Sequence, residues 1–283
     1  MRRILGACLT SCCRYDDNWR DIPARTFPSA RARDTARDRL IALAPLNHPR
    51  SGAALRASAR PPSESELAEI PWLQGLTDIE RQRALDALVV SEVQVGELIC
   101  RIGRPVTYWF GLLDGLLKMS NDDSQGAVIT FTGVAPGGWF GEGTVLKREV
   151  YRYNIQALRK SRVAGLPVDT FHWLLDHSIG FNRFVMNHLN ERLGQFIAAR
   201  EIDRISSPDL RVARNLAALF HPLLSPNVGG ILRITQQELA YLVGLSRQRV
   251  NEALTALADK GWIRVEYGGL RVLDLQALRS GEL

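Results

Sequence analysis

The spacing of apolar positions along the chain changes period. Residues 67–88 and 167–220 repeat apolar side chains at helical intervals, whereas residues 89–166 alternate short apolar runs with glycine-centred turns. Short runs closed by turn residues at regular spacing are typical of antiparallel strands in a barrel or roll. We therefore expect an α+β protein with an antiparallel β-roll of about eight strands followed by helices.

The segment 234–274 carries the most detailed pattern, ITQQELAYLVGLSRQRVNEALTALADKGWIRVEYGGLRVLD. Thr235 and Glu238 have the spacing of a capping box at the start of one helix, and Gly244 suits its end. Ser246 is then a suitable N-cap for a second helix. The segment therefore predicts two short helices joined by a tight turn.

A hairpin is expected after the second helix. The runs 262–267 and 270–273 flank Gly268-Gly269, which is a two-residue hairpin signal. Two short helices followed by a hairpin form the layout of a winged helix-turn-helix. This layout indicates binding of double-stranded DNA.

The start of the second helix, expected over 246–259, carries side chains able to contact base edges. Val250, Leu254 and Leu257 form its buried stripe, which leaves the polar groups exposed. Arg pairs with guanine, Gln or Asn with adenine, and Glu accepts from cytosine. The candidates are Ser246, Arg247, Gln248, Arg249, Asn251 and Glu252. A solvated helix face is the alternative, but the whole unit is more specific than its charges.

A longer helix without proline is expected over 179–205. Its apolar residues follow the 3-4-3 spacing of a coiled-coil seam: Met186, Leu189, Leu193 and Phe196. Packing of this face on its own domain stays open. We favour homodimerisation because a helix-turn-helix protein generally needs two half-sites.

Charge changes this picture only at the N-terminus. The net charge is +6, yet residues 1–66 hold 12 Arg, no Lys and 7 acidic residues, so the remainder is nearly neutral. DNA contacts in the folded part must therefore come from a local basic cluster. Residues 1–66 are rich in Ala, Pro and Ser without a clear period, so we expect a disordered extension. A start codon assigned too far upstream is an alternative origin of this stretch.

The cysteines and the apolar runs indicate the cellular compartment of the protein. Cys8, Cys12, Cys13 and Cys100 form no disulfide framework. No run approaches the roughly 18 apolar residues of a transmembrane helix, and the run at 4–9 is short for a signal peptide. We therefore expect a cytoplasmic protein without membrane contact.

A roll, a long helix and a winged helix-turn-helix follow one another along the chain. In this order of parts the chain resembles the cyclic-AMP receptor / fumarate–nitrate regulator (Crp–Fnr) superfamily of bacterial transcription factors. The most specific parts are 234–274 and the Gly-Trp-Phe-Gly-Glu-Gly run at 138–143. The resemblance implies a homodimer on an inverted-repeat operator, with RNA polymerase as a further partner at the loop 221–230. It divides the chain into a 1–66 extension, a 67–178 cyclic-nucleotide-binding-like jelly roll, a 179–205 dimerisation helix and a 206–283 DNA-binding domain.

The resemblance also implies DNA contacts at single positions. Family members contact bases at positions occupied here by Arg247, Gln248, Asn251 and Glu252. Cyclic-AMP receptors carry Arg-Glu-Thr-Val-Gly-Arg where this chain has Arg-Gln-Arg-Val-Asn-Glu at 247–252, so a different operator is expected. Phosphate contacts, which fix position rather than sequence, fall on Thr235, Gln237, Gly268 and Gly269.

The family's cyclic-nucleotide pocket joins a Gly-Glu pair to an Arg followed by Ser or Thr. The Glu holds the ribose hydroxyl and the Arg holds the cyclic phosphate. This chain has Gly141-Glu142 and Arg152 at the family spacing, but Tyr153 replaces the small hydroxyl residue. We expect the phenol ring to fill the phosphate space and Arg152 to pair with Glu142. A different small effector, or none, is favoured over a cyclic nucleotide, so no cofactor is assigned.

Two functions of other classes stay open. One is a small-molecule sensor whose main output is not DNA binding, supported by the motif at 141–152. The other is a redox iron–sulfur sensor using the four cysteines, against which the adjacent Cys12-Cys13 and their distance from the roll argue. The histidines show no metal-ligand spacing. No phosphate-binding loop or nucleophile elbow occurs, so no enzyme is expected.

Overall fold

The computed structural model describes residues 59–122 and 128–281. The expectation of disorder for residues 1–58 lies outside these ranges, as do Cys8, Cys12 and Cys13.

Residues 59–66 correct the expected boundary of the extension. Arg60 exchanges two backbone hydrogen bonds with Val90 at the edge of the roll, of 3.0 and 2.8 Å. Helix α2 (Glu64–Ala68) then begins with a capping box between Ser63 and Glu66. The buried Glu66 carboxylate accepts hydrogen bonds from Arg60, at 2.6 and 2.8 Å. This segment is ordered because its charged groups find partners on the roll.

The helical pattern at 67–88 forms more than one element. The end of α2 is followed by the 3-10 helix η1 (Pro71–Gly75) and by α3 (Asp78–Ala87). Pro71 cannot continue a helix from the preceding turn. Thr77 and Glu80 form a capping box at the start of α3.

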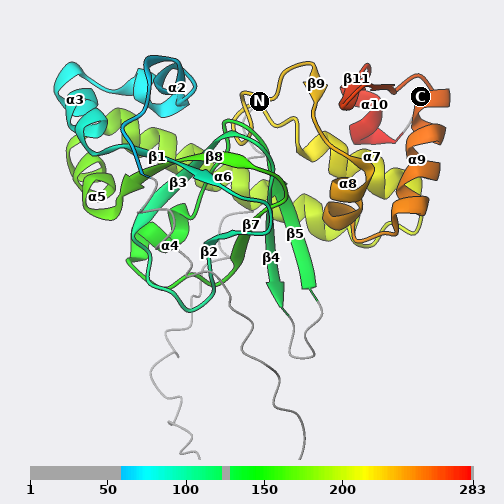
Figure 1. Ribbon diagram of the computed structural model, residues 1–283, viewed down its shortest axis with the longest axis horizontal. Coiled ribbons are helices and arrows are strands. Elements are labelled where there is room, and N and C mark those ends of the chain that lie inside the picture. The colour runs from blue at the N-terminus through cyan, green and yellow to red at the C-terminus, as the bar shows by residue number, and fades with distance from the viewer. Residues whose placement is uncertain (1–58, 123–127, 282–283) are drawn as a thin grey trace, which may run out of the picture. The chain divides into compact units, whose positions relative to one another are not determined.

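The predicted roll is confirmed, with eight strands in the described residues (Figure 1). One antiparallel sheet has the order β1-β8-β3-β6 and the other has the order β2-β7-β4-β5. The bounds are β1 Val89–Val93, β2 Leu98–Cys100, β3 Tyr108–Asp114, β4 Leu117–Asp122, β5 Val128–Val134, β6 Trp139–Phe140, β7 Asn154–Ala157 and β8 Ser161–Pro167. Their inner side chains form one buried cluster that includes Phe110, Leu117 and Ile155.

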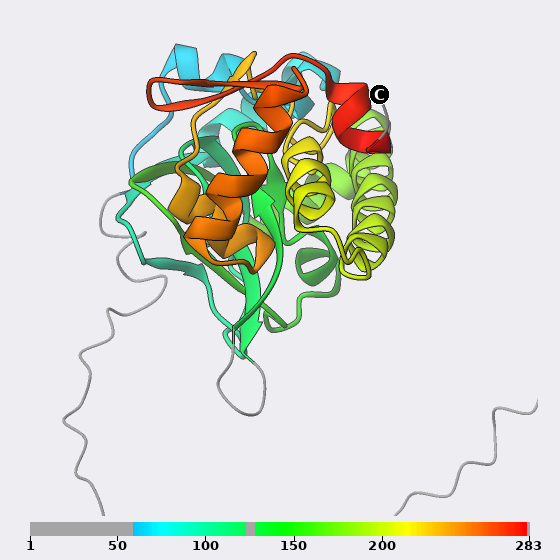
Figure 2. The ribbon, with the colours of Figure 1, turned by 90° about the vertical axis from the view of Figure 1, so that its right-hand side faces the viewer.

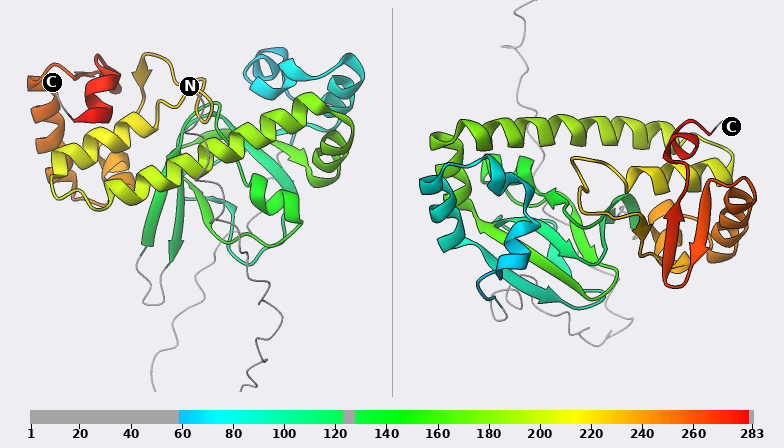
Figure 3. Two further views of the ribbon diagram at one scale, coloured as in Figure 1. Left: turned by 180° about the vertical axis from the view of Figure 1, so that it is seen from behind. Right: turned by 90° about the horizontal axis from the view of Figure 1, so that it is seen from above.

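Three helices pack on the roll: α4 (Glu142–Lys147), α5 (Val168–His177) and α6 (Ile179–Ile202). An aromatic cluster joins α5 and α6 to η1 and to the strands, with Trp72 lying 5.3 Å from Trp139 and 5.4 Å from Phe181 between ring centroids. Helix α6 runs beside the roll and ends next to α7 (Figure 3).

The C-terminal domain has the predicted winged helix-turn-helix order. Its elements are α7 (Pro208–Ala218), β9 (Ile231–Leu232), α8 (Gln236–Val243), α9 (Arg247–Asp259), β10 (Ile263–Glu266), β11 (Gly269–Val272) and α10 (Leu275–Ser280). Strand β9 adds to the hairpin, in the order β10-β11-β9. Figure 2 shows α9 with this hairpin beyond its C-terminal end.

The C-terminal domain shares a hydrophobic core with the roll. Leu116 and Ala135 of the roll belong to the same buried cluster as residues of α7, α8 and α9. None of the helices in the described ranges is long and apolar enough to cross a membrane.

Candidate functional site

The N-terminus of α8 is held by the predicted capping box. Thr235 N–H donates to Glu238 Oε2 at 2.7 Å, and Glu238 N–H donates to Thr235 Oγ1 at 3.2 Å. The side chains of Thr235 and Gln237 are exposed at this end. A helix N-terminus with exposed donors favours anions such as phosphate.

Helix α9 presents its first turns to solvent. Ser246 Oγ accepts from Arg249 N–H at 3.2 Å, and Val250, Ala253, Leu254 and Leu257 are buried. All six candidate residues at its start are exposed: Ser246, Arg247, Gln248, Arg249, Asn251 and Glu252. The structure therefore brings them together on one surface.

The exposed groups of α9 are not equally free. Glu252 accepts from Arg249 Nη1 at 2.5 Å and from Gln248 Nε2 at 3.2 Å, and these bonds hold its pKa below the usual value. Asn251 Oδ1 accepts from Gln236 Nε2 at 2.6 Å. Arg247 has no polar partner within the described residues, so its guanidinium is free to bind a base.

The wing requires both of its glycines for backbone reasons. Gly268 has φ +77°, and a Cβ on Gly269 would lie 2.6 Å from the Leu232 carbonyl oxygen. The hairpin turn is Tyr267-Gly268, one residue before the expected Gly268-Gly269, because Glu266 pairs with Gly269. Sequence reasoning did not single out the fully exposed Tyr267 in this turn or the exposed Arg264 on β10. Tyr267 directly precedes the Gly268-Gly269 pair, which was the available signal.

The family's effector motif has a different arrangement here. Gly141, with φ +90°, precedes α4 and sets Glu142 inside the protein. Glu142 Oε1 lies 3.5 Å from Arg192 Nε and 3.5 Å from His188 Nδ1, both on α6. Burial alone would raise the pKa of Glu142, but the neighbouring His188 and the charge of Arg192 hold it below the usual value. Arg192 also donates to the Trp139 carbonyl at 2.8 Å.

The expected pairing of Arg152 with Glu142 is wrong. Arg152 is 73% exposed and pairs with Glu149 at 2.9 Å, because Glu142 faces α6 instead. The ring of Tyr153 packs against the roll core, and burial raises its pKa. Arg152 and Glu142 therefore have different partners in this structure. His188 and Arg192 were missed, since nothing in a helix sequence reveals a partner on another element.

Of the four cysteines, Cys100 is the one that lies in the described part of the chain. Cys100 is buried in β2, and burial raises the pKa of its thiol. Within the described part of the chain, no group of three or more His, Cys, Asp or Glu side chains is placed to hold a metal ion.

The seam predicted on α6 is mostly exposed. Met186 and Leu193 are 66% and 60% exposed, and Ile197 extends their stripe at 58%. Phe196 is partly exposed, with its ring centroid 6.5 Å from that of Phe131. Leu189 instead packs against the core of the roll. The outward stripe is apolar and lacks a partner within the described protomer.

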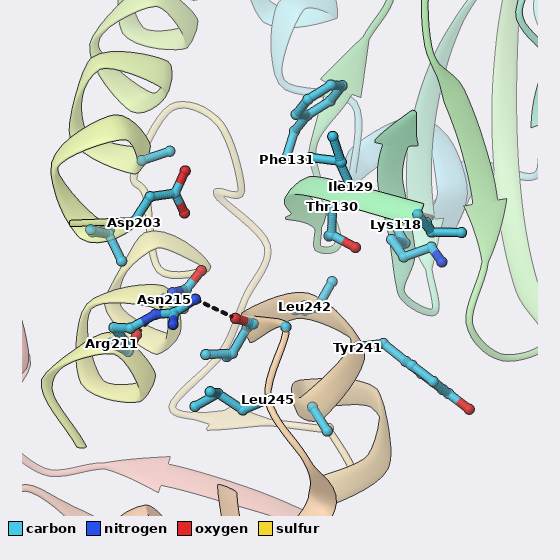
Figure 4. A pocket seen from close by; sticks show the side chains of 16 residues that line it. Lys118, Ile129, Thr130, Phe131, Asp203, Arg211, Asn215, Tyr241, Leu242 and Leu245 are labelled. Atoms are coloured by element: carbon cyan, nitrogen blue, oxygen red, sulfur yellow. Dashed lines mark hydrogen bonds between the residues drawn. The ribbon is translucent and has the colours of Figure 1, made fainter. Parts of the chain in front are cut away.

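A groove of about 430 Å³ lies among β5, α6, α7 and α8 (Figure 4). Arg211 lines it and donates to the Val243 carbonyl at 3.1 Å. Lys118 Nζ lies 5.9 Å from the centroid of the Tyr241 ring. The wall also includes the apolar Phe131 and Leu242 and the polar Thr130 and Asp203.

Comparison with known proteins matches both halves of this architecture. The cyclic nucleotide-binding domain family matches residues 90–178, and the Crp-like helix-turn-helix domain family matches residues 210–280. The transcriptional regulator SdrP of Thermus thermophilus is 32% identical over 175 residues, which cover 60% of this chain and 82% of SdrP.

Two further similarities agree with these matches. A CRP-like cAMP-activated global transcriptional regulator of Mycobacterium tuberculosis is 26% identical over 197 residues, covering 65% of this chain and 83% of the relative. The structure of FixK2 from Bradyrhizobium japonicum shares the fold, with a TM-score of 0.57 and 16% identity over 69% of this chain and 98% of FixK2.

Proposed function

Because the chain belongs to the Crp–Fnr family of DNA-binding transcription regulators, we propose that it acts as a cytoplasmic homodimer on an inverted-repeat operator. Each protomer inserts the start of α9 into a major groove, and the two half-sites lie about one helical turn apart. The N-terminus of α8 and the wing contact phosphates on either side.

The observation that carries this proposal is the surface at the start of α9. Arg247, Gln248, Arg249, Asn251 and Glu252 are all exposed there, while the opposite face of the helix is buried. Arg, Gln and Asn are the side chains that form bidentate bonds with base edges. Arg247 is free to contact guanine.

The exposed stripe on α6 supports the homodimer. A second copy of α6 would cover Met186, Leu193 and Ile197, which an isolated protomer leaves in water. Apolar stripes at this spacing pair as coiled coils.

DNA binding in this chain does not depend on a cyclic nucleotide in the family's pocket. The M. tuberculosis relative is named as cAMP-activated, but here Arg152 faces solvent and Glu142 is already engaged by Arg192 and His188. A different effector, or none, fits these residues better.

RNA polymerase is the further partner in this proposal, with the loop 221–230 as its contact. Leu223 in this loop is an exposed apolar residue. Leu223→Ala should lower transcriptional activation without changing operator affinity. Unchanged activation in a reconstituted transcription assay would remove the loop from the contact surface.

The test is selection of random double-stranded DNA by the full chain at fixed salt, with no nucleotide, with cyclic AMP and with cyclic GMP. We expect an inverted repeat to be enriched equally in all three. Enrichment only with a nucleotide would overturn the effector statement. Binding without sequence preference in all three would overturn the proposed reading surface.

A further inference from the structure

A bidentate ion pair joins the roll to the N-terminus of α8. Arg159 lies in the turn between β7 and β8, and its Nε donates to Glu238 Oε1 at 2.7 Å. Its Nη2 donates to Glu238 Oε2. A guanidinium and a carboxylate joined by two parallel bonds are held in both distance and orientation.

Glu238 has a second task in the same place. Its carboxylate accepts the Thr235 N–H at 2.7 Å and the Thr235 hydroxyl at 2.8 Å, which completes the cap of α8. Arg159 therefore binds the residue that caps α8, and this N-terminus of α8 is the part proposed to contact phosphate. The Arg159 and Glu238 side chains are only 26% and 10% exposed, so water screens this pair less than a surface pair.

Apolar contacts surround the ion pair. Leu158 packs against the core of the C-terminal domain, and its N–H donates to the Leu116 carbonyl at 2.9 Å. On β5, a Cβ at Gly133 would lie 2.8 Å from Leu219 Cδ2 and 2.9 Å from Leu242 Cδ1. The roll and the C-terminal domain thus also meet through apolar contacts at Leu158 and Gly133.

The exposed start of α9 does not take part in this contact. The contact therefore orients the helix without covering it. A dimeric protein can bind two half-sites at once only if both recognition helices keep a defined distance and angle.

We propose that Arg159 is a positioning residue for DNA recognition: its ion pair with Glu238 fixes the helix-turn-helix on the roll and thereby sets the half-site spacing that the dimer accepts. This inference rests on the proposed homodimeric DNA binding.

The test compares operator affinity across half-site spacings. Each added base pair turns one half-site by about 35° relative to the other, so a rigid dimer should lose affinity steeply. Arg159→Ala should lower affinity at the preferred spacing about tenfold, as expected for a lost charge-assisted hydrogen bond. It should also lower the ratio between the preferred and the neighbouring spacings, while base preference within a half-site stays unchanged.

Variants separate positioning from simple helix stability. Glu238→Gln can keep the cap, because Gln also serves in a capping box, yet it loses the ion pair. It should reproduce the effect of Arg159→Ala, and the double variant should be no worse than either single one. Arg159→Lys should restore part of the spacing preference. Thr235→Ala, which removes only the cap side chain, should weaken binding at all spacings alike.

Lys160→Ala is the matched control. Lys160 lies in the same turn but pairs with Glu92 of the roll at 2.7 Å, so its loss should leave spacing preference unchanged. If Arg159→Ala weakens all spacings equally or has no effect, Arg159 is not a positioning residue.

A measurement without DNA keeps this inference separate from the proposed function. Spin labels introduced by Val95→Cys on the roll and Thr255→Cys on α9, with the native cysteines replaced, report the distance between the two domains. Dilution with unlabelled protein isolates the distance within one protomer. The distance distribution should be narrow in the protein with the native Arg159 and in the Lys160→Ala variant. It should be broad in the Arg159→Ala variant. A distribution that Arg159→Ala leaves unchanged would overturn the inference even if operator binding is confirmed.

Discussion

At the scale of single residues, Arg247 and Arg249 differ although they share one exposed helix face. Arg249 is paired with Glu252, and this ion pair must break before either side chain can bind a base. Arg247 has no such pair within the described residues. The two arginines should therefore contribute differently to base recognition.

Arg247→Ala is expected to lower the affinity for the best operator by about 1–3 kcal/mol and to remove base preference at one position of each half-site. Binding titrations on single-base operator variants measure this. A loss of equal size on every sequence would make Arg247 a phosphate contact. Arg249→Ala provides the comparison, with a smaller loss expected because it also frees Glu252.

The buried Arg192 of α6 and the exposed Arg152 should also differ in how much they contribute to the stability of the fold. Arg192→Leu leaves the Glu142 carboxylate buried without its guanidinium, which should cost about 3–5 kcal/mol of unfolding free energy. Arg152→Ala, at an exposed site, should change it by about 0.5 kcal/mol or less. Denaturant unfolding measures both. If Arg192→Leu is as mild as Arg152→Ala, the Glu142 cluster does not stabilise the fold.

At the scale of elements, α6 performs two tasks on two faces. Val185, His188 and Arg192 face the roll and are buried, while Met186, Leu193 and Ile197 face outward. The inner face holds Glu142 and the outer face is proposed to bind a second copy. A change on the outer face should therefore affect assembly without affecting the roll.

Leu193→Glu should dissociate the dimer. Burial of one Leu side chain contributes about 1.5–3 kcal/mol, and each dimer loses two of them. Sedimentation should show a monomer of unchanged secondary structure, and affinity for the full operator should fall to that of a half-site. Ala198→Glu is the matched control, since Ala198 is exposed on the same helix but lies about 100° around the helix axis from Ile197. A dimer that survives Leu193→Glu would place the interface elsewhere.

At the scale of the whole molecule, local contacts join segments far apart in the chain. Glu66 binds Arg60 at 2.6 Å and lies 3.4 Å from Arg162 of β8, so the segment 59–66 is held on the roll. Arg159 and Glu238 connect the roll to the C-terminal domain in the same way. The pair of Arg60 and Glu66 makes stability depend on pH.

The hydrogen bonds from Arg60 lower the pKa of Glu66 from an ordinary value of 4.5 to about 2. A carboxyl whose pKa is lower in the folded state stabilises the protein above its unfolded pKa and loses that contribution as pH falls through the folded pKa. The stability difference between the wild type and Glu66→Gln should therefore be full above pH 4.5 and shrink towards pH 2. Urea unfolding across this range measures it, and a difference independent of pH would contradict it.

Local patterns in the sequence were enough to predict the elements and the exposed face of α9. The capping box at Thr235 and the N-cap at Ser246 appear in the structure as predicted. The predicted hairpin also forms, but its turn is Tyr267-Gly268, one residue before the expected Gly268-Gly269. Each of these signals links residues within a few positions. Helical and strand periods likewise show which side of an element is apolar.

Side-chain pairing across the fold was decided only by tertiary structure. Arg152 precedes a Tyr and follows the family spacing, yet it turns to solvent, and Glu142 takes its partners from α6. The sequence by itself determined the roll, the long helix and the winged helix-turn-helix, because neighbouring residues encode secondary structure. Only packing decided that Glu142 meets Arg192 and that Arg159 meets Glu238, because a charge inside the protein binds the nearest opposite charge in space.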